Sequence, residues 1–480
     1  MPVTPPVSDC YTTHYDLHEF LLACKQAFLA TDSIQIVSIS SAVDPVDPLA
    51  VLARLSQPQQ QHFYFENTTQ QQSLLAIDSA IHLQLTGPDR FTQARDWVRR
   101  LSQQVIQVGD GSLVGASARF FCSFNFHAGR IHAQSDRHFA SPETTGSILL
   151  PRWQLLRSSD RSHLVANLVV DQQFDPQQQA DRVWKGFKMI SSLELEALEL
   201  ADQSRSVTPL RLQEVGSASQ FRQAVEQALQ LIRTGQLDKV VLARAWDVIA
   251  ASPLDWITCL SNLRQFHPNC YIFSSHDGSG QIFLGASPER LVTLQDQQLE
   301  TDALAGSAPR GTTAIEDAQL ADHLLSSEKE THEHQFVIDF ITQRLQRLGL
   351  QPTLSQPRLL QLSNIQHLHT PIAATVPPNV HLLDIVAELH PTPAVAGVPR
   401  DRACDYIQAL EPFERSFYAA PIGWVDTAGN GEFAVGIRSA IIADRTARLF
   451  AGAGIVAGSS PDKELAEVEW KLQALLKAIT

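Results

Sequence analysis

Two side chains of opposite chemistry stand beside apolar segments in the second half of the chain. Lys239 begins the apolar run Val240–Leu242, and Glu289 follows the turn pair Ser287–Pro288. Such a lysine usually places its ammonium in water, and a carboxylate at a turn is usually solvated. In a closed cleft, loss of hydration favours the neutral forms of both groups. Lys239 would then accept a proton, and Glu289 would donate one to a leaving oxygen.

Acidic side chains on two predicted helices offer oxygen ligands for a metal ion. Glu333 lies in the charged string at 328–340, and Glu464, Glu467 and Lys471 share one face of the last helix. Oxygen ligands from separate helices suit Mg²⁺, which usually keeps some of its waters. The same residues are also typical of a solvated helix face with an internal Glu–Lys pair.

An arginine and two glycines complete the candidates that the residue types suggest. We expect Arg438, in VGIRSA, within a strand that points toward AGAGIV, where Gly452 and Gly454 permit close approach of the backbone. An arginine in an apolar strand needs an anionic partner, and its planar guanidinium suits a carboxylate. AGAGIV lacks the third glycine of a dinucleotide loop and the lysine of a phosphate-binding loop.

These residues require a scaffold of strands and helices, and the sequence predicts an α+β arrangement because runs of strands alternate with runs of helices. The expected strands are Ile34–Ile39, Leu164–Val170, Asp238–Val248, Cys270–Ser274, Gln281–Ala286, Arg290–Leu294, Gln298–Ala303, Glu432–Ala443 and Arg448–Ala453. The expected helices are Ser219–Arg233, a long stretch Ala314–Leu348 that bends near Ser326, and Asp462–Ile479.

The composition is that of an acidic globular protein. The 480 residues are 44% hydrophobic and 18% charged, and the net charge of −14 argues against a nucleic-acid partner. A small anionic substrate would need local cations or a metal ion. No apolar run approaches the ~18 residues of a membrane-spanning helix. Without a signal peptide, the six scattered cysteines indicate reduced thiols and a cytoplasmic protein.

The chain is expected to divide near its polar stretch Ala201–Pro209. Residues 1–205 are Gln-rich and show no chemistry-bearing pattern, so we expect an N-terminal α+β region that contributes to the same fold. Residues 206–480 hold all the candidate functional residues, and we expect the catalytic region there.

Ten strings in the second half, in a fixed order, resemble the chorismate-utilising enzymes: isochorismate synthases, salicylate synthases, anthranilate synthase large chains and aminodeoxychorismate synthases. The strings are LDKVVLAR, FLGASPERLV, ALAGSAPRG, SSEKETHEH, IQHL, HPTPAVAG, ERSFYAAPIGW, FAVGIRSA, LFAGAGIV and ELAEVEWK. The resemblance implies a fold of antiparallel β-sheets packed together and flanked by helices. It also implies that residues 206–480 are the chorismate-binding catalytic region.

The resemblance implies a role for each matching residue. Lys239 resembles the base that activates water for attack on the ring, and Glu289 resembles the acid that protonates the departing 4-hydroxyl on the opposite face. Glu333 and Glu467 resemble the magnesium ligands, and Glu464 resembles an outer ligand that acts through water. The remaining matches resemble carboxylate binders (Arg438 and Lys471), a ring-side contact (His367) and positions that shape the pocket (Gly306, Ser307, Ala394, Tyr418, Gly423, Gly452 and Gly454).

Two departures from the family pattern favour water over ammonia as the nucleophile. Ala305 stands where aminodeoxychorismate synthases of the covalent type carry a nucleophilic lysine, and Ala394 stands where ammonia-using members tend to carry threonine. We therefore expect a Mg²⁺-dependent isochorismate synthase, a monomer or weak dimer with no amidotransferase subunit, serving menaquinone, phylloquinone or siderophore supply. Alternatives are a salicylate synthase, an ammonia-using enzyme of the anthranilate synthase type, or a non-catalytic chorismate-binding subunit.

Overall fold

Strands from the first 200 residues join the same β-sheet as strands from the rest of the chain. The computed structural model describes residues 13–31, 33–109, 116–129, 144–159, 161–191, 210–362 and 365–479. Within these ranges, 21 strands are connected by backbone pairing. β2 (His62–Asn67) pairs antiparallel with β10 (Tyr271–His276), and β5 (Arg119–Phe124) pairs antiparallel with β18 (Pro421–Asp426). The expected boundary at Ala201–Pro209 lies outside the described residues.

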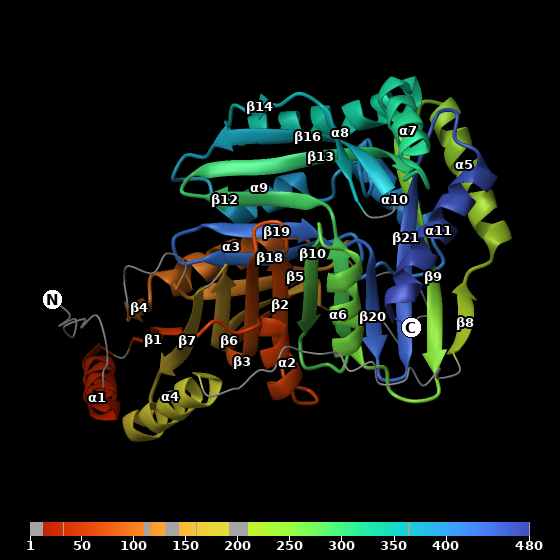
Figure 1. Ribbon diagram of the computed structural model, residues 1–480. Coiled ribbons are helices and arrows are strands. Elements are labelled where there is room, and N and C mark those ends of the chain that lie inside the picture. The colour runs from red at the N-terminus through yellow and green to blue at the C-terminus, as the bar shows by residue number, and fades with distance from the viewer. Residues whose placement is uncertain are drawn as a thin grey trace.

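The N-terminal region is a layer of strands with helices against it (Figure 1). Its strands pair mostly antiparallel, while β1 and β4 are parallel. Besides β2 and β5, its elements are α1 (His14–Thr31), β1 (Gln35–Val43), α2 (Pro48–Leu55), β3 (Gln72–Leu85), α3 (Arg90–Ser102), β4 (Val105–Val108), β6 (Gly146–Ser158), β7 (Arg161–Val170) and α4 (Pro176–Ser191).

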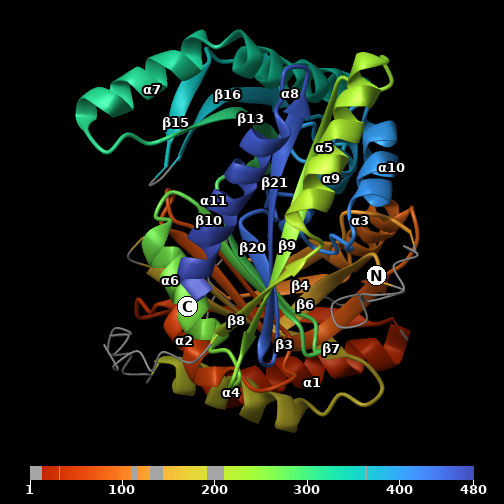
Figure 2. The same cartoon turned by 90° about the vertical axis from the view of Figure 1, so that its right-hand side faces the viewer.

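Two long antiparallel strands form the backbone of the C-terminal region. β9 (Lys239–Ala250) pairs with β21 (Thr446–Val456) along its length, which places Lys239 opposite Val456 and Val241 opposite Gly454. Helices α5 (Ala218–Arg233) and α11 (Pro461–Ile479) run along these strands and pack against them (Figure 2). The predicted helix at 219–233 is confirmed, and it begins one residue earlier because Ser217 is its N-cap.

A second group of strands carries the charged helices of the region. β12 (Arg290–Gln295), β13 (Gln298–Pro309) and β16 (Ile365–Thr375) pair antiparallel, and α8 (Glu328–Arg347) packs on β13. The predicted bend of the long helix is confirmed: α7 (Ala314–Ser326) ends there, and Ser327 then accepts a hydrogen bond from the Glu330 amide as the N-cap of α8.

One expected strand is two strands in the structure. The segment predicted as Glu432–Ala443 divides into β19 (Gly431–Val435) and β20 (Ser439–Ala443). β19 pairs with β12 and β18, whereas β20 pairs with β11 (Ile282–Ser287) and β21, so the chain must turn between them. Arg438 lies in this turn with φ of 47°, so the prediction that it sits within a strand was wrong.

The remaining C-terminal elements connect these two groups. They are β8 (Leu210–Val215), α6 (Trp256–Phe266), β11 (Ile282–Ser287), β14 (Thr353–Leu354), β15 (Arg358–Gln361), α9 (Leu382–Leu389), β17 (Gly397–Val398) and α10 (Arg400–Leu410). Among the helices in the described ranges, none has both the length and the apolar character that crossing a bilayer demands.

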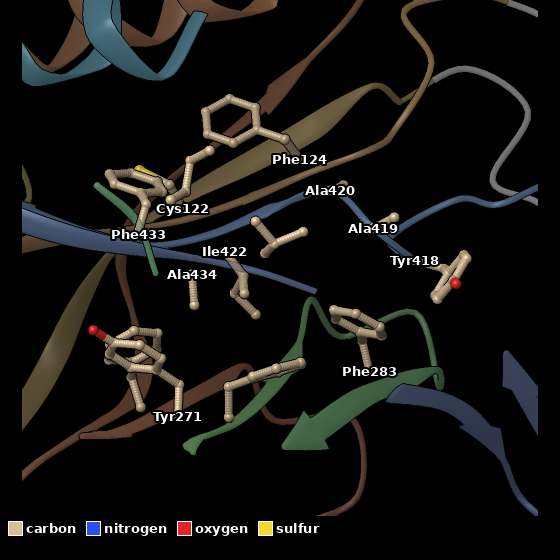
Figure 3. Close-up of a cluster of buried hydrophobic side chains, with 14 of the residues drawn as sticks. Cys122, Phe124, Tyr271, Phe283, Tyr418, Ala419, Ala420, Ile422, Phe433 and Ala434 are labelled. Carbon is tan, nitrogen blue, oxygen red and sulfur yellow. The ribbon is translucent and has the colours of Figure 1, made fainter. Parts of the chain in front are cut away.

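A shared hydrophobic core joins the two regions of the chain. Figure 3 shows part of it, where Cys122 and Phe124 of the N-terminal region lie near Ile422 and Phe433 of the C-terminal region. The larger core cluster contains residues from both regions. Burial of this apolar surface is the main force that holds the strands of the functional site in place.

Arg415 links three segments around the site, and its removal is expected to destabilise the fold. It donates hydrogen bonds to Glu411, to the Val395 carbonyl and to the Val241 carbonyl, and the Arg415 and Glu411 side chains are 1% and 3% exposed. Arg415→Ala leaves a buried carboxylate unpaired, so we expect the free energy of unfolding to fall by about 3–5 kcal/mol. Urea denaturation measures this change.

The matched control is Arg445→Ala, because the Arg445 side chain is 60% exposed beside Asp444. Its effect should stay within about 0.5 kcal/mol. Equal stabilities of the two variants would contradict the role assigned to the buried pair.

Candidate active site

Most of the sequence-predicted site residues surround one cavity of about 140 Å³. Its wall is built from β9, β13, β16, β21, the β11–β12 turn and helices α8 and α11. The predicted residues in its lining are Glu289, Gly306, Ser307, Glu333, His367, Ala394, Tyr418, Arg438, Gly452, Gly454, Glu464, Glu467 and Lys471.

Two predicted residues do not line this cavity. Lys239 lies directly behind its wall and reaches it through contact with Glu333. Gly423 lies in β18, between β5 and β19. A Cβ atom at Gly423 would stand 2.0 Å from the Glu432 carbonyl oxygen, so this glycine serves the close approach of strands and does not face the cavity.

Lys239 is a buried lysine held by a carboxylate. Its side chain is 1% exposed, and its Nζ lies 2.7 Å from Oε1 of Glu333 on α8. Gly454, on the paired strand β21, makes room for this contact. A Cβ atom there would stand 2.6 Å from Glu333 Oε1 and 3.2 Å from Lys239 Cε. Pairing with Glu333 offsets the loss of hydration that burial imposes on the ammonium.

Glu289 is a buried carboxyl that is protonated at neutral pH. It is 4% exposed, and its backbone is fixed by hydrogen bonds from its amide to Ser287 Oγ and from the Val435 amide to its carbonyl. Burial raises the pKa of Glu289 to about 8, and the nearby Lys239 charge offsets part of that rise. The group can therefore donate a proton near neutral pH.

Four carboxylates from two helices gather at one end of the cavity. Glu330 and Glu333 are three residues apart on α8, and Glu464 and Glu467 are three residues apart on α11. Burial raises the pKa of Glu330 and of Glu464, and repulsion from the neighbouring carboxylates adds to both shifts. Burial also acts on Glu467, but its ion pair with Lys471 holds its pKa below the ordinary value.

This end of the cavity has a donor set that fits Mg²⁺, since the ion prefers carboxylate oxygens and relieves repulsion among them. In the structure Glu333 faces Lys239, Glu467 faces Lys471, and Lys329 lies 3.5 Å from Glu464. Within the described ranges, no three acidic, histidine or cysteine side chains are already arranged around a common metal position. Metal binding here therefore requires carboxylates to exchange a lysine partner for the ion.

The other end of the cavity is cationic. Nη1 of Arg438 is buried and has no hydrogen-bond partner among the described residues, and one Nη2 contact at 3.3 Å reaches His367 Nε2. Burial and the Arg438 charge lower the pKa of His367 well below its usual range, so the histidine stays neutral. A buried guanidinium nitrogen with no partner is suited to bind an anionic group of a ligand.

A bulge in β13 shapes the wall between the two ends. Gly306 has φ of 75°, and the register of β13 on β16 shifts between Ala305 and Ser307. The Ser307 amide donates to Glu330 Oε2, and its hydroxyl lies 2.9 Å from His367 Nδ1. Glycine suits this position because a side chain there would need a strained backbone.

Glu330 and Lys329 belong to the site, although the sequence analysis did not select them. Both line the cavity, and Lys329 lies between Glu330 and Glu464. A signal existed for Glu330: it precedes Glu333 by three residues, the same spacing that Glu464 has to Glu467.

Comparisons with known proteins agree with this architecture. The family model described as "Chorismate binding enzyme" matches residues 21–480. The salicylate biosynthesis isochorismate synthase of Pseudomonas aeruginosa is 32% identical over 99% of this chain and 96% of that protein. Isochorismate synthase MenF of Bacillus subtilis is 28% identical over 92% of this chain and 93% of that protein.

A solved structure shows the same fold. The menaquinone-specific isochorismate synthase MenF from Escherichia coli superposes with a TM-score of 0.76 and 28% identity, covering 97% of this chain and 99% of that one. The chain therefore belongs to the family of chorismate-binding enzymes. The expected α+β fold of antiparallel sheets flanked by helices is confirmed.

The raised pKa of Glu289 predicts a specific pH dependence of stability. The folded protein keeps this carboxyl neutral up to about pH 8, whereas the unfolded chain ionises it near 4.5. Ionisation therefore favours the unfolded state between these values, and wild type should lose up to about 1.4 kcal/mol per pH unit there relative to Glu289→Gln. Urea denaturation of both proteins from about pH 5 to about pH 8 measures the difference.

Glu226→Gln is the control, because Glu226 is exposed on α5. It removes one carboxylate, as Glu289→Gln does, but from the solvent-exposed surface. A constant difference between wild type and Glu289→Gln across the range would show that the Glu289 carboxyl titrates normally.

Proposed function

We propose that this protein is an isochorismate synthase, an isomerase that converts chorismate to isochorismate in the cytoplasm. The observation that carries the proposal is that a buried protonated carboxyl, Glu289, lines the same cavity as Arg438, while the buried Lys239 lies behind its wall in contact with Glu333. Nη1 of Arg438 has no hydrogen-bond partner among the described residues. The names of the two relatives and of the solved structure support the same reaction.

The two ends of the cavity match the charges of the substrate. Chorismate carries two carboxylates, which an acidic protein of net charge −14 repels unless cations are gathered locally. Arg438 offers one carboxylate its Nη1, which has no hydrogen-bond partner among the described residues. Mg²⁺ held by Glu333 and Glu467, with Glu464 and Glu330 beside them, would neutralise and orient the other carboxylate. Lys471 anchors this end through the Gly452 carbonyl and Glu467.

In the proposed reaction the protein accepts one proton and donates another. Water adds to the ring carbon beside the carboxylate-bearing one, and its proton passes to Lys239 Nζ, which would be the neutral amine once Glu333 has exchanged this lysine for the metal ion. Both ring double bonds shift by one position, the bond to the 4-hydroxyl breaks, and Glu289 protonates the departing hydroxyl so that it leaves as water. Each proton transfer contributes about 10²–10⁴-fold to the rate.

Water, and not ammonia, is the proposed nucleophile. Ala305 and Ala394 both lie at the cavity, and neither side chain can form a covalent amine adduct or hydrogen-bond ammonia. The reaction therefore needs no amidotransferase subunit, and we propose a monomer or weak dimer as the working form.

Product analysis tests the proposed function. Purified protein is incubated with chorismate and Mg²⁺, with and without ammonium salts, and the products are separated by chromatography and identified by mass. We expect isochorismate alone in both reactions. Salicylate with pyruvate would assign the protein as a salicylate synthase, an amino product would assign it to the ammonia-using enzymes, and unchanged chorismate would indicate a non-catalytic binding protein.

Loss of either proton-transfer group should stop turnover without unfolding the protein. We expect Lys239→Ala and Glu289→Gln each to lower kcat by about 10²–10⁴-fold, because each removes one proton transfer. The matched controls are Lys463→Ala and Glu226→Gln, which alter exposed residues. Circular dichroism checks the fold, and kcat near the wild-type value in either active-site variant would reject the role of that residue.

Activity should require Mg²⁺ at the acidic end of the cavity. Chelation with EDTA is expected to abolish turnover, and added Mg²⁺ is expected to restore it, since the ring carboxylate would otherwise face four glutamates. Calorimetry should detect Mg²⁺ binding to wild type and to Glu226→Gln, and weaker binding to Glu333→Gln and Glu467→Gln. Undiminished activity after thorough chelation would rule out a role for Mg²⁺. Equal Mg²⁺ affinities of wild type, Glu333→Gln and Glu467→Gln would place the ion outside this group of glutamates.

A further inference from the structure

We propose that Thr392 is a positioning residue that fixes the acidic proton of Glu289 on Oε2, the oxygen that then serves the leaving hydroxyl. This inference rests on the proposed function, in which Glu289 is the proton donor. Thr392 matches no role in the family comparison made from the sequence, and it touches the carboxyl and not the substrate.

The contact joins two segments that are themselves held firmly. Thr392 follows α9 in the chain and is 3% exposed. Its carbonyl accepts hydrogen bonds from the amides of Val395 and Ala396 at 3.1 and 2.9 Å, which fixes the turn. Its hydroxyl lies 3.5 Å from Glu289 Oε1, across a sequence separation of 103 residues.

The hydroxyl is the sole hydrogen-bond partner of the Glu289 carboxyl within the part of the chain that the structure describes. Other charged and titratable groups face this carboxyl without bonding to it. Lys239 on β9 and Asp302 on β13 act on its charge, and Tyr418 lies close enough to be affected by it. Thr392 is therefore the group that can distinguish one carboxyl oxygen from the other.

A neutral carboxyl has one accepting oxygen and one oxygen that carries the proton. When Thr392 donates to Oε1, that oxygen acts as the acceptor and the proton resides on Oε2. Because Glu289 lines the cavity and Oε2 has no partner among the described residues, the proton is presented to the ligand. The arrangement removes the need for the acid to reorient before it donates.

Two substitutions separate the hydroxyl from the space it fills. Thr392→Val keeps the shape of the side chain and removes the hydroxyl, whereas Thr392→Ser keeps the hydroxyl. Infrared spectroscopy follows the C=O stretch of the protonated Glu289 carboxyl against pH, with the band assigned by its loss in Glu289→Gln. Steady-state kinetics with chorismate and Mg²⁺ give kcat and KM for each variant across the same pH range.

We expect the hydroxyl to matter in both measurements. A donated hydrogen bond stabilises the carboxylate, so in Thr392→Val the C=O band should move to higher frequency and persist to higher pH than in wild type. The alkaline limb of kcat should move to higher pH in parallel. We expect kcat to fall about tenfold with KM within about twofold of wild type, and Thr392→Ser to restore both the band and the rate.

Two results would overturn the proposal. The first is a Thr392→Val protein whose C=O band and kcat profile match those of wild type. The second is a Thr392→Ser protein as impaired as Thr392→Val, which would show a packing role for the methyl group. If wild type makes no isochorismate, the proposed function fails, and the infrared comparison still decides whether Thr392 orients the carboxyl.

Discussion

The site depends on one buried ion pair, between Lys239 at the start of β9 and Glu333 on α8. A lysine that is 1% exposed requires a partner, because an unpaired buried ammonium is strongly unfavourable. The partner comes from a helix carried by the other group of strands, and Gly454 on β21 keeps the intervening space clear. The pair therefore joins the two groups of strands that enclose the cavity.

Charge is separated along the cavity in a way that suits a dianionic ligand. At one end four glutamates outnumber three lysines and provide oxygen donors for a divalent cation. At the other end Arg438 has a buried nitrogen with no hydrogen-bond partner in the described part of the chain, beside a histidine that burial holds neutral. In the same cavity Glu289 is kept protonated by burial, and Thr392 contacts one of its oxygens. Acid, base and anion sites thus occupy one small volume inside a protein of net charge −14.

Local patterns in the sequence predicted local structure well. The features that they did not predict depend on pairing between residues far apart in the chain. The α7–α8 bend followed from a serine that caps the second helix. The turn at Arg438 could not be predicted, because β19 and β20 separate only through pairing with different distant strands. Glu330 was visible as a helical spacing, whereas Thr392 was not, since its partner lies 103 residues away. The N-terminal region showed no motif, yet β2 and β5 extend the shared sheet.

Labelling with heavy-oxygen water is the most direct test of the central claim. In that claim Lys239 accepts a proton from the attacking water, and Glu289 protonates the original hydroxyl as it leaves. Chorismate and Mg²⁺ are incubated with the protein in the labelled solvent, and the isochorismate formed early in the reaction is examined by mass spectrometry. The account predicts one labelled oxygen, located in the new ring hydroxyl. Isochorismate that retains only the oxygen atoms of chorismate would show transfer within the substrate and would leave Lys239 without a water to activate.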